Sequence, residues 1–313
     1  MADFFHAVSA VFLIFSMMLV GFGLGKIGWL TSSEKRFLSR FVVNVAVPMN
    51  CITGVLNNLE REDLRSAGRM LAVPLVCTLV LLAVSGVIAR LLRLPRERRG
   101  VFVAMSFLPN SLFIGVPMST QLFGEISVPY VMLYYMVCTV FTQTVLVLLV
   151  EKAGSKEAAA ITPAGLLRDL FTKPPVLGVL TAFACLLLGI RPPELFMSFA
   201  KYMSGTVTPL ALMYCGFIVY ELGLSGIRLE RGLPAMLVLR LVLSPALCAG
   251  LCALLGVTGL ASQVFIIEAA LPVVSQVPVL AGAYGADERY AAVGFCLSML
   301  GVFITIPVIM MLI

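Results

Sequence analysis

The sequence predicts an all-helical polytopic membrane protein with ten transmembrane helices. Its 313 residues are 60% hydrophobic and only 12% charged, whereas soluble domains are about half apolar and about a quarter charged. The mean hydropathy of +1.05 points the same way. Each span needs about 20 residues and a short loop, so this length accommodates about ten spans. Little chain remains for a soluble domain.

Ten apolar runs, taken in chain order, define the expected spans. The first run lacks the positive segment of a signal peptide, and the first cation, Lys26, lies near its end, so we expect a retained helix with its N-terminus outside. The sixth run is short and is expected to begin at Pro174 and Pro175, because proline suits a helix start. The expected spans are residues 5–27, 35–57, 69–92, 99–123, 127–150, 175–190, 196–221, 233–256, 260–284 and 289–312.

Lysine and arginine residues are distributed unevenly between alternate loops. One side holds sixteen of them and the other holds five, and the positive-inside rule places the richer side in the cytoplasm. We therefore expect a protein of the plasma (inner) membrane with both termini outside the cytoplasm. The sixteen are Lys26, Lys35, Arg36, Arg40, Arg90, Arg93, Arg96, Arg98, Arg99, Lys152, Lys156, Arg168, Lys173, Arg228, Arg231 and Arg289; the five are Arg61, Arg65, Arg69, Arg191 and Lys201.

Charge and cysteine content predict neither nucleic-acid binding nor a metal site. The net charge of +6 is explained by the cytoplasmic loops, and no basic stretch is interleaved with aromatic residues, so nucleic-acid binding is not expected. The eight cysteines form no CxxC pair and are accompanied by one histidine, His6, so no metal site is expected. The GxGxxG letters at 23–28 follow an apolar helix rather than a strand, and they predict no dinucleotide cofactor.

The spans also lack the residues of an intramembrane enzyme. Such an enzyme needs an HExxH pair, two aspartates, or serine with histidine inside the spans. No expected span contains aspartate, and His6 lies near the outer end of the first span. We therefore expect no enzymatic activity and no catalytic residue. The sequence does not separate a carrier from a channel, which saturable counter-transport in liposomes distinguishes.

The two halves of the chain share a pattern at an offset of 161 residues. The offset takes span two onto span seven and span four onto span nine. Each half holds five spans, an odd number, so the halves are expected to insert in opposite orientations, and inverted repeats are typical of secondary transporters. The predicted units are an N-terminal repeat, 1–150, a short cytoplasmic linker, 151–174, and a C-terminal repeat, 175–313. The matched pairs are Pro48 with Pro209, Pro117 with Pro278, and Gly124 with Gly285.

Spans four and nine are the chemically distinctive pair. Span four contains Pro109 and Pro117, span nine contains Pro272 and Pro278, and polar side chains lie between the prolines. A proline inside a helix removes a hydrogen bond and costs about 3 kcal/mol. At membrane depth, broken helices are tolerated only when they are buried in protein or line a cavity. The stretches are therefore either simple kinks relieved by neighbouring helices or two broken helices that cross at the midplane.

Broken helices at the midplane favour an anionic ligand. Pro117 and Pro278 would each open a second half-helix whose N–H groups point into the cavity, and a helix N-terminus attracts negative charge. The implied ligand is a small organic anion such as a carboxylate. The candidate substrate-binding residues are Asn110, Ser111, Gly115, Ser275 and Gln276.

These stretches resemble the auxin efflux carrier family, which includes the plant PIN-formed carriers. The sequence LPNSLFIGVP at 108–117, followed by Gly124, resembles the fourth-helix motif of that family. The sequence AALP at 269–272, followed by VP at 277–278 and by Tyr284, resembles its ninth helix. The likeness covers nearly the whole chain.

The resemblance implies both a fold and a function. The sequence VAVP at 45–48 and the Thr208-Pro209 pair are similar to the scaffold helices of the family. The family implies ten helices in two inverted repeats, usually a homodimer, and export of organic anions. It also implies an elevator-type movement against a scaffold of spans one, two, six and seven. Asn110 would contact the substrate carboxylate, and Pro117 and Pro278 would mark the crossover.

The central connection, 151–174, lacks the long hydrophilic loop of the plant members. Regulation through such a loop is therefore not expected. The compact form is similar to bacterial members, some of which carry malonate or malate, and the expected substrates are auxin-like acids or dicarboxylates. A sodium-coupled bile-acid-type symporter shares the broken-helix architecture and is the alternative. The expected partners are the small organic anion, membrane lipids and a second copy of the chain.

Three further polar residues inside spans are candidates for coupling or for lining the cavity. Glu268 either carries a coupling proton or makes a structural hydrogen bond. Arg240 either pairs with Glu268 or extends towards the cytoplasm. Gln143, flanked by Thr142 and Thr144, either faces the cavity or bonds neighbouring helices.

Overall fold

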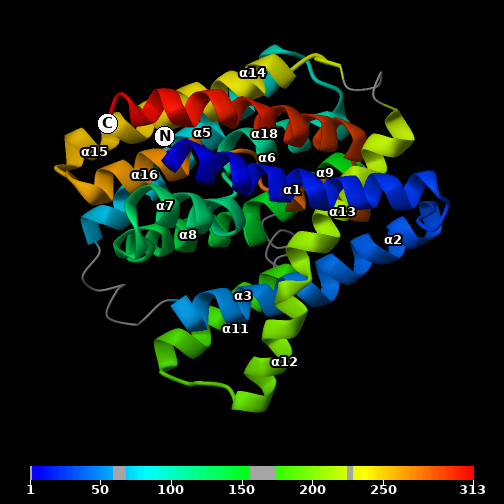
Figure 1. Cartoon of the computed structure of the whole chain (residues 1–313), viewed down its shortest axis with the longest axis horizontal. Coiled ribbons are helices and arrows are strands. Elements are labelled where there is room, and N and C mark those ends of the chain that lie inside the picture. Colours follow the sequence, from blue (N-terminus) through cyan, green and yellow to red (C-terminus); the bar gives the residue numbers. More distant parts are fainter. Residues whose placement is uncertain (1, 59–67, 156–173, 224–227) are drawn as a thin grey trace.

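The computed structural model describes residues 2–58, 68–155, 174–223 and 228–313, and these residues form an all-helical structure (Figure 1). The all-helical class predicted from composition is confirmed. Six helices in the described segments are long and apolar enough to cross a membrane: Ser32–Asn57, Gly68–Leu91, Val128–Gly154, Glu194–Glu221, Leu233–Leu255 and Glu288–Met310. Shorter apolar helices cover Phe15–Lys26 and Leu260–Ala270.

Each expected span coincides with helical backbone. The first five correspond to α1 (Ala2–Lys26), α2 (Ser32–Phe41) with α3 (Val47–Asn58), α5 (Gly68–Leu91), α6 (Arg96–Phe107) with α7 (Val116–Phe123), and α8 (Val128–Phe141) with α9 (Val147–Gly154). The other five correspond to α11 (Pro174–Leu188), α12 (Glu194–Gly205) with α13 (Val207–Leu222), α14 (Leu233–Val238) with α15 (Ser244–Leu255), α16 (Leu260–Ala270) with α17 (Gln276–Tyr284), and α18 (Glu288–Met310).

Some expected features lie outside the described residues. These are most of the 151–174 linker and the cations Arg61, Arg65, Lys156, Arg168 and Lys173.

Wider π-helical turns interrupt several of these helices, at Val42–Ala46, Ser111–Gly115, Thr142–Leu146 and Leu239–Leu243. A π turn accommodates an extra residue within a helix and frequently occurs at functional sites. Three of these turns contain residues of the sites described below, namely Ser111, Gln143 and Arg240.

We divide the helices into two groups, which contact each other where α1 meets α7 and where α13 meets α18. In the first group, α1 lies along α13, and both α11 and α12 contact α3; Figure 1 shows α3, α11 and α12 together below the other helices. In the second group, α5 contacts α6 and α15, α6 contacts α9, α15 contacts α16, and α17 contacts α18.

Glycines allow the closest approach within the first group. A Cβ atom added to Gly21 of α1 would lie 1.9 Å from the carbonyl oxygen of Met213, and one added to Gly216 of α13 would lie 1.8 Å from that of Met18. Small residues at such crossings are typical of helix packing in membranes. The α1–α13 contact therefore depends on these two positions.

The outer faces of the spans are apolar. On α5, Val73 and Cys77 are buried, whereas Leu75 and Leu79 are exposed. On α18, Ile304 is 70% exposed. An apolar exterior is unfavourable in water and suits the hydrocarbon region of a bilayer.

Candidate functional site

The helical run of span four is interrupted by Leu108, Pro109 and Asn110. α6 ends at Phe107, and Leu108 is extended, with φ −117° and ψ 127°. Proline disfavours helical backbone at the residue before it, and it has no N–H to continue the helix. The helix resumes after Asn110, which has φ −87° and ψ 64°.

Span nine is interrupted in the same way. α16 ends at Ala270, and Leu271, the residue before Pro272, is extended with φ −64° and ψ 155°. The helix resumes at Gln276, and Ser275 occupies the N-cap position without a side-chain capping bond.

The second half-helices begin earlier than the sequence predicted. Helical backbone resumes at Ser111 and Gln276, so the prediction that Pro278 opens its half-helix was wrong. Pro117 stands at the second position of α7, which follows the π turn Ser111–Gly115. The first proline of each span sets the break, because it restricts the residue before it. Pro278 is buried in the first turn of α17, where a missing N–H is tolerated. Pro117 lies in α7, and its side chain is outside the described set.

The two breaks bond to one another. The N–H of Asn110 donates to the carbonyl of Pro272 at 3.0 Å, and Pro109 and Val273 form an antiparallel bridge. The N–H of Val273 donates to Oγ of Ser298 at 3.1 Å. These bonds satisfy backbone groups that the interruptions release, as membrane burial requires.

Arg240 joins the C-terminal ends of α6 and α16. Its guanidinium donates to the carbonyl of Ser106 at 3.5 Å, to Oγ of Ser244 at 2.5 Å, and to the carbonyl of Ala269. Ser244 also donates to the Ala269 carbonyl, at 2.8 Å. The C-terminus of a helix carries partial negative charge and favours a cation. Arg240 is 0% exposed, so it does not extend towards the cytoplasm but holds the two helix ends together.

Glu268 is also fully buried, but it does not pair with Arg240. Its Oε1 accepts from Oγ of Ser119 at 3.1 Å, and its Oε2 has no hydrogen-bond partner within the described segments. The ion pairs among the described residues do not include Arg240 with Glu268. A Cβ atom added to Gly115 would lie 2.4 Å from both carboxylate oxygens of Glu268. Gly115 therefore makes room for this carboxyl group.

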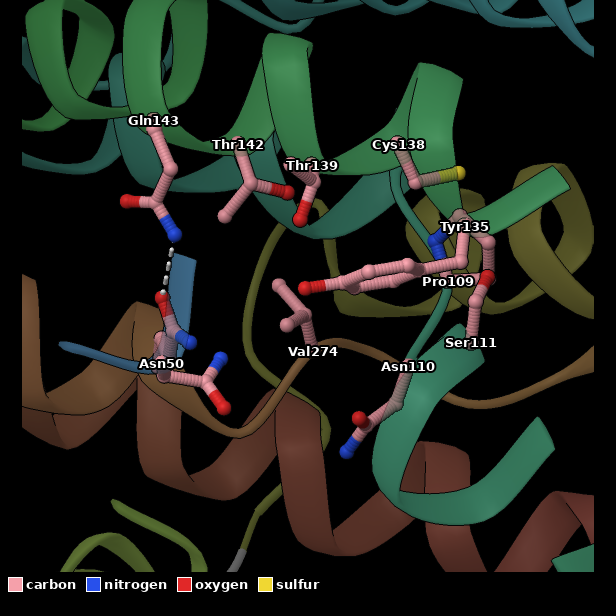
Figure 2. A pocket seen from close by; sticks show the side chains of 11 residues that line it. Asn50, Pro109, Asn110, Ser111, Tyr135, Cys138, Thr139, Thr142, Gln143 and Val274 are labelled. Atoms are coloured by element: carbon pink, nitrogen blue, oxygen red, sulfur yellow. Dashed lines mark hydrogen bonds between the residues drawn. The ribbon is translucent and has the colours of Figure 1, made fainter. Parts of the chain in front are cut away.

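A pocket of about 340 Å³ lies beside the breaks, as Figure 2 shows. Its polar lining consists of amides and hydroxyls, and none of its lining residues is charged. The lining residues are Asn50, Pro109, Asn110, Ser111, Tyr135, Cys138, Thr139, Thr142, Gln143, Val274 and Gln276.

The pocket brings together part of the predicted site. Pro109, Asn110, Ser111, Gln143 and Gln276 line it. The other candidates do not: Gly115 and Glu268 contact each other, Arg240 holds the helix ends, and Pro272, Ser275 and Pro278 are buried outside the lining.

Sequence reasoning missed Asn50 and, on α8, Tyr135, Cys138 and Thr139. Tyr135, Thr139 and Thr142 recur at a spacing that places them on one helical face together with Gln143. This helical spacing of polar residues could have indicated from the sequence that they share a face. For Asn50 the signal was weaker, a single polar residue shortly after Pro48 in span two.

Several buried polar atoms of the lining are available to a bound molecule. Oγ of Ser111, the hydroxyl of Tyr135 and Oε1 of Gln143 have no hydrogen-bond partner among the described residues. Gln143 donates through Nε2 to Oε1 of Gln276 at 3.4 Å. A buried polar group without a partner costs about 1–3 kcal/mol, so three in one pocket favour a polar ligand.

Backbone donors lie at both breaks. The first N–H groups of a helix have no partner within it. After Asn110, the N–H groups of Ile114 and Gly115 donate back to the Asn110 carbonyl at 3.2 and 3.1 Å. The N–H groups of residues 111–113, which lie between Asn110 and Ile114, are left for other partners. At the second break, the N–H of Val277 donates to Val274 at 3.2 Å, and Pro278 has none. Both breaks thus leave some N–H groups at the start of the second half-helix without a bond back to the break.

Interrupted membrane helices around a midplane pocket are typical of secondary transporters. The sequence matches, over residues 6–310, the family described as "Membrane transport protein". The chain belongs to this family, the auxin efflux carrier family. The resemblance predicted from the span motifs is confirmed, and the chain is a multi-pass membrane transporter.

Two similar proteins are also described as transporters. The first, an uncharacterized transporter of Methanothermobacter thermautotrophicus, is 28% identical over 287 residues, which cover 89% of each chain. The second, an uncharacterized transporter of Methanocaldococcus jannaschii, is 23% identical over 299 residues, which cover 91% of this chain and 92% of the relative. In both cases the similarity spans nearly the whole transporter.

The transporter has a second pocket, which is cationic. It lies between α2 and the C-terminal end of α17 and is open to solvent, and Lys35, Arg36 and Arg40 line it. Lys35 forms ion pairs with Glu221 at 2.8 Å and with Glu288 at 2.6 Å. Two carboxylates therefore already balance the most buried of these cations.

Proposed function

We propose that the chain is a secondary transporter of small organic anions, which bind through a carboxylate beside Asn110. The observation that carries this proposal is the set of neutral donors at the first break: the Asn110 amide, the Ser111 hydroxyl and the first N–H groups of the following helix. A helix N-terminus favours negative charge. Neutral donors also avoid a buried cation, which would be costly whenever the substrate is absent.

In this proposal the fold consists of two inverted five-helix repeats, 1–150 and 175–313, joined by the linker 151–174. The packing supports this arrangement. α1 packs on α13 of span seven, and its counterpart α11 packs on α3 of span two. The α5–α6 contact likewise has its counterpart in the α15–α16 contact. Contacts that are exchanged by the repeat relation are expected around a pseudo-two-fold axis.

The two helix groups support an elevator-type movement. All pocket residues except Asn50 belong to α8, to the turn at Thr142–Leu146, or to the two breaks, which lie in the second group. A substrate held mainly by one group moves with it past the other. We further propose a homodimer in the plasma (inner) membrane, with both termini outside the cytoplasm and organic anions as exported cargo.

We assign proton coupling to Glu268. It is a buried intramembrane carboxyl in contact with Gly115, close behind the first break, and such residues are functional candidates. Glu268→Gln should abolish accumulation driven by a proton gradient and spare substrate exchange. Unchanged accumulation would instead make Glu268 structural. Accumulation that requires sodium would favour a sodium-coupled bile-acid-type symporter.

Counterflow of radiolabelled malonate, malate and indole-3-acetate in proteoliposomes tests the proposed function. A hydrogen bond to a charged group contributes about 1.5–3 kcal/mol, so Asn110→Ala should weaken substrate affinity about 10- to 150-fold. Asn110→Asp should weaken it further, because it opposes one negative charge with another. Asn44→Ala is the matched control, since Asn44 is exposed and its amide donates to the Arg40 carbonyl at 2.8 Å.

Wild-type affinity in both Asn110 variants, with the protein folded, would move the anion site elsewhere. Flux that does not saturate and shows no counterflow would indicate an anion channel rather than a carrier.

A further inference from the structure

The pocket has two polar ends. Figure 2 shows Asn50 and Gln143 at one end and Asn110 and Ser111 at the other, with Tyr135 extending between them. The proposed carboxylate site uses only the Asn110 end. The groups at the Asn50 end are therefore available to a different part of the ligand.

Asn50 is held in one orientation. Oγ of Ser204, on α12, donates to Oδ1 of Asn50 at 2.8 Å. Since the carbonyl oxygen of the amide is engaged, its NH₂ group is left for the pocket. Asn50 is only 5% exposed, and it lines the pocket.

Close contacts on both sides fix the helix that carries Asn50. A Cβ atom added to Gly178 of α11 would lie 2.6 Å from Cα of Pro48, and one added to Gly54 would lie 2.5 Å from the hydroxyl of Tyr135. Packing this close leaves little room for α3 to shift against α11, and in this conformation it places α3 directly beside Tyr135. A donor on a rigid element discriminates better than one on a loop.

The Asn50 end also supplies an acceptor. Gln143 donates through Nε2 to Gln276, and its Oε1 has no partner within the described part of the chain. The end therefore combines the NH₂ donor of Asn50 with the Oε1 acceptor of Gln143. A hydroxyl, an amide or a protonated carboxyl satisfies both, whereas a methyl group leaves both unpaired and is rejected for that reason.

We propose that Asn50, fixed by Ser204, is the specificity-determining residue that selects anions with a second hydrogen-bonding group remote from the carboxylate. This inference rests on the proposed function, because it takes the carboxylate to lie at the Asn110 end. Asn50 contacts the remote group, and Ser204 is a positioning residue that acts through Asn50.

Calorimetric titration of the purified full-length protein with butyrate, 4-hydroxybutyrate and succinate tests the proposal. These acids share a four-carbon chain and differ at the end remote from one carboxylate. A neutral hydrogen bond contributes about 0.5–1.5 kcal/mol, so the wild type should bind 4-hydroxybutyrate and succinate about 2- to 12-fold more tightly than butyrate. Asn50→Leu should abolish this preference, because it removes the donor that the methyl group of butyrate leaves unpaired.

Ser204 supplies a second readout that a merely structural role would not give. Ser204→Ala should reduce the preference, and Ser204→Thr, which retains the hydroxyl, should restore it. Asn44→Leu is the matched control and should keep the wild-type preference, since Asn44 is exposed outside the pocket. Equal binding of the three acids by the wild type, or an unchanged preference in Asn50→Leu, overturns this inference alone. Absence of binding of all three acids overturns the proposed function as well.

Discussion

In span four the chain leaves the helix at Leu108, and in span nine it leaves the helix at Leu271; in both cases the next residue is proline. Both preceding half-helices end at a carbonyl that accepts from Arg240. The side chains that follow differ. The first break contributes Asn110 and Ser111 to the pocket, whereas the second contributes Val274 and Gln276.

The two spans are interrupted by the same backbone arrangement, but the side chains at the two breaks have different roles. Proline and a shared arginine determine where each helix stops, and they do so alike in both spans. The donors for an anion collect at the first break, where Asn110 precedes free N–H groups. The half-helix before the second break contributes Glu268, which packs behind the first break against Gly115. The two breaks are thus alike in backbone and unequal in chemistry.

The largest effect is expected from the loss of Arg240, which donates to a carbonyl beside each break. Arg240→Ala leaves the carbonyls of Ser106 and Ala269 without their cation, and losing bonds of this kind costs about 3 kcal/mol. Arg240→Lys should not restore stability, because an ammonium lacks the planar fork that reaches several acceptors. Thermal unfolding of the purified protein measures both. Arg191→Ala, at an exposed position, is the control and should stay within about 0.5 kcal/mol of wild type. Equal stability of Arg240→Ala and Arg191→Ala would remove Arg240 from the account.

The next prediction concerns the contact between Gly115, after the first break, and Glu268, before the second. Gly115→Ala places a methyl group against both carboxylate oxygens of Glu268, and overpacking of this kind typically costs about 1–3 kcal/mol. Adding Glu268→Ala should recover most of that loss, because it removes the colliding group. Gly86→Ala on α5, whose added Cβ meets nothing within 4 Å, is the control and should be neutral or slightly stabilising. If the second substitution recovers nothing, Gly115 does not serve to accommodate Glu268.

Much of this arrangement was predictable from the sequence. Hydropathy located helical segments, and six helices of the described residues are long and apolar enough to cross a membrane. The paired prolines located the breaks, since the residue before proline leaves the helix. The side-chain contacts were not predictable. Arg240 and Glu268 appeared close enough to pair, but Arg240 binds carbonyls and Glu268 faces Gly115.

The wide turns explain part of what was missed. An extra residue in a helix rotates the face that follows it, by about 100° at 3.6 residues per turn. Arg240 lies inside such a turn, so its direction does not follow from ideal helical spacing. Asn50 lines the pocket and accepts a hydrogen bond from Ser204 on a distant helix. The sequence carries no signal for this tertiary contact beyond a single polar residue shortly after Pro48.

The smallest effect is expected at Gln276, and it compares the contributions of the two breaks to carboxylate affinity. Gln276 lies at the second break and accepts from Gln143 at 3.4 Å. Gln276→Ala removes neutral hydrogen bonds of about 0.5–1.5 kcal/mol, so carboxylate affinity should fall about 2- to 12-fold. This is less than the loss expected for Asn110→Ala. Equilibrium binding of a radiolabelled carboxylate to both variants gives the order, and a reversed order would assign the anion to the second break.

A cryo-electron microscopy structure with a bound small carboxylate tests the central claim most directly. We expect the carboxylate oxygens within hydrogen-bonding distance of the Asn110 amide and the Ser111 hydroxyl, in the pocket that contains no charged lining residue. The alternative anion site is the pocket lined by Lys35, Arg36 and Arg40. A carboxylate found there, with none beside Asn110, would contradict the account.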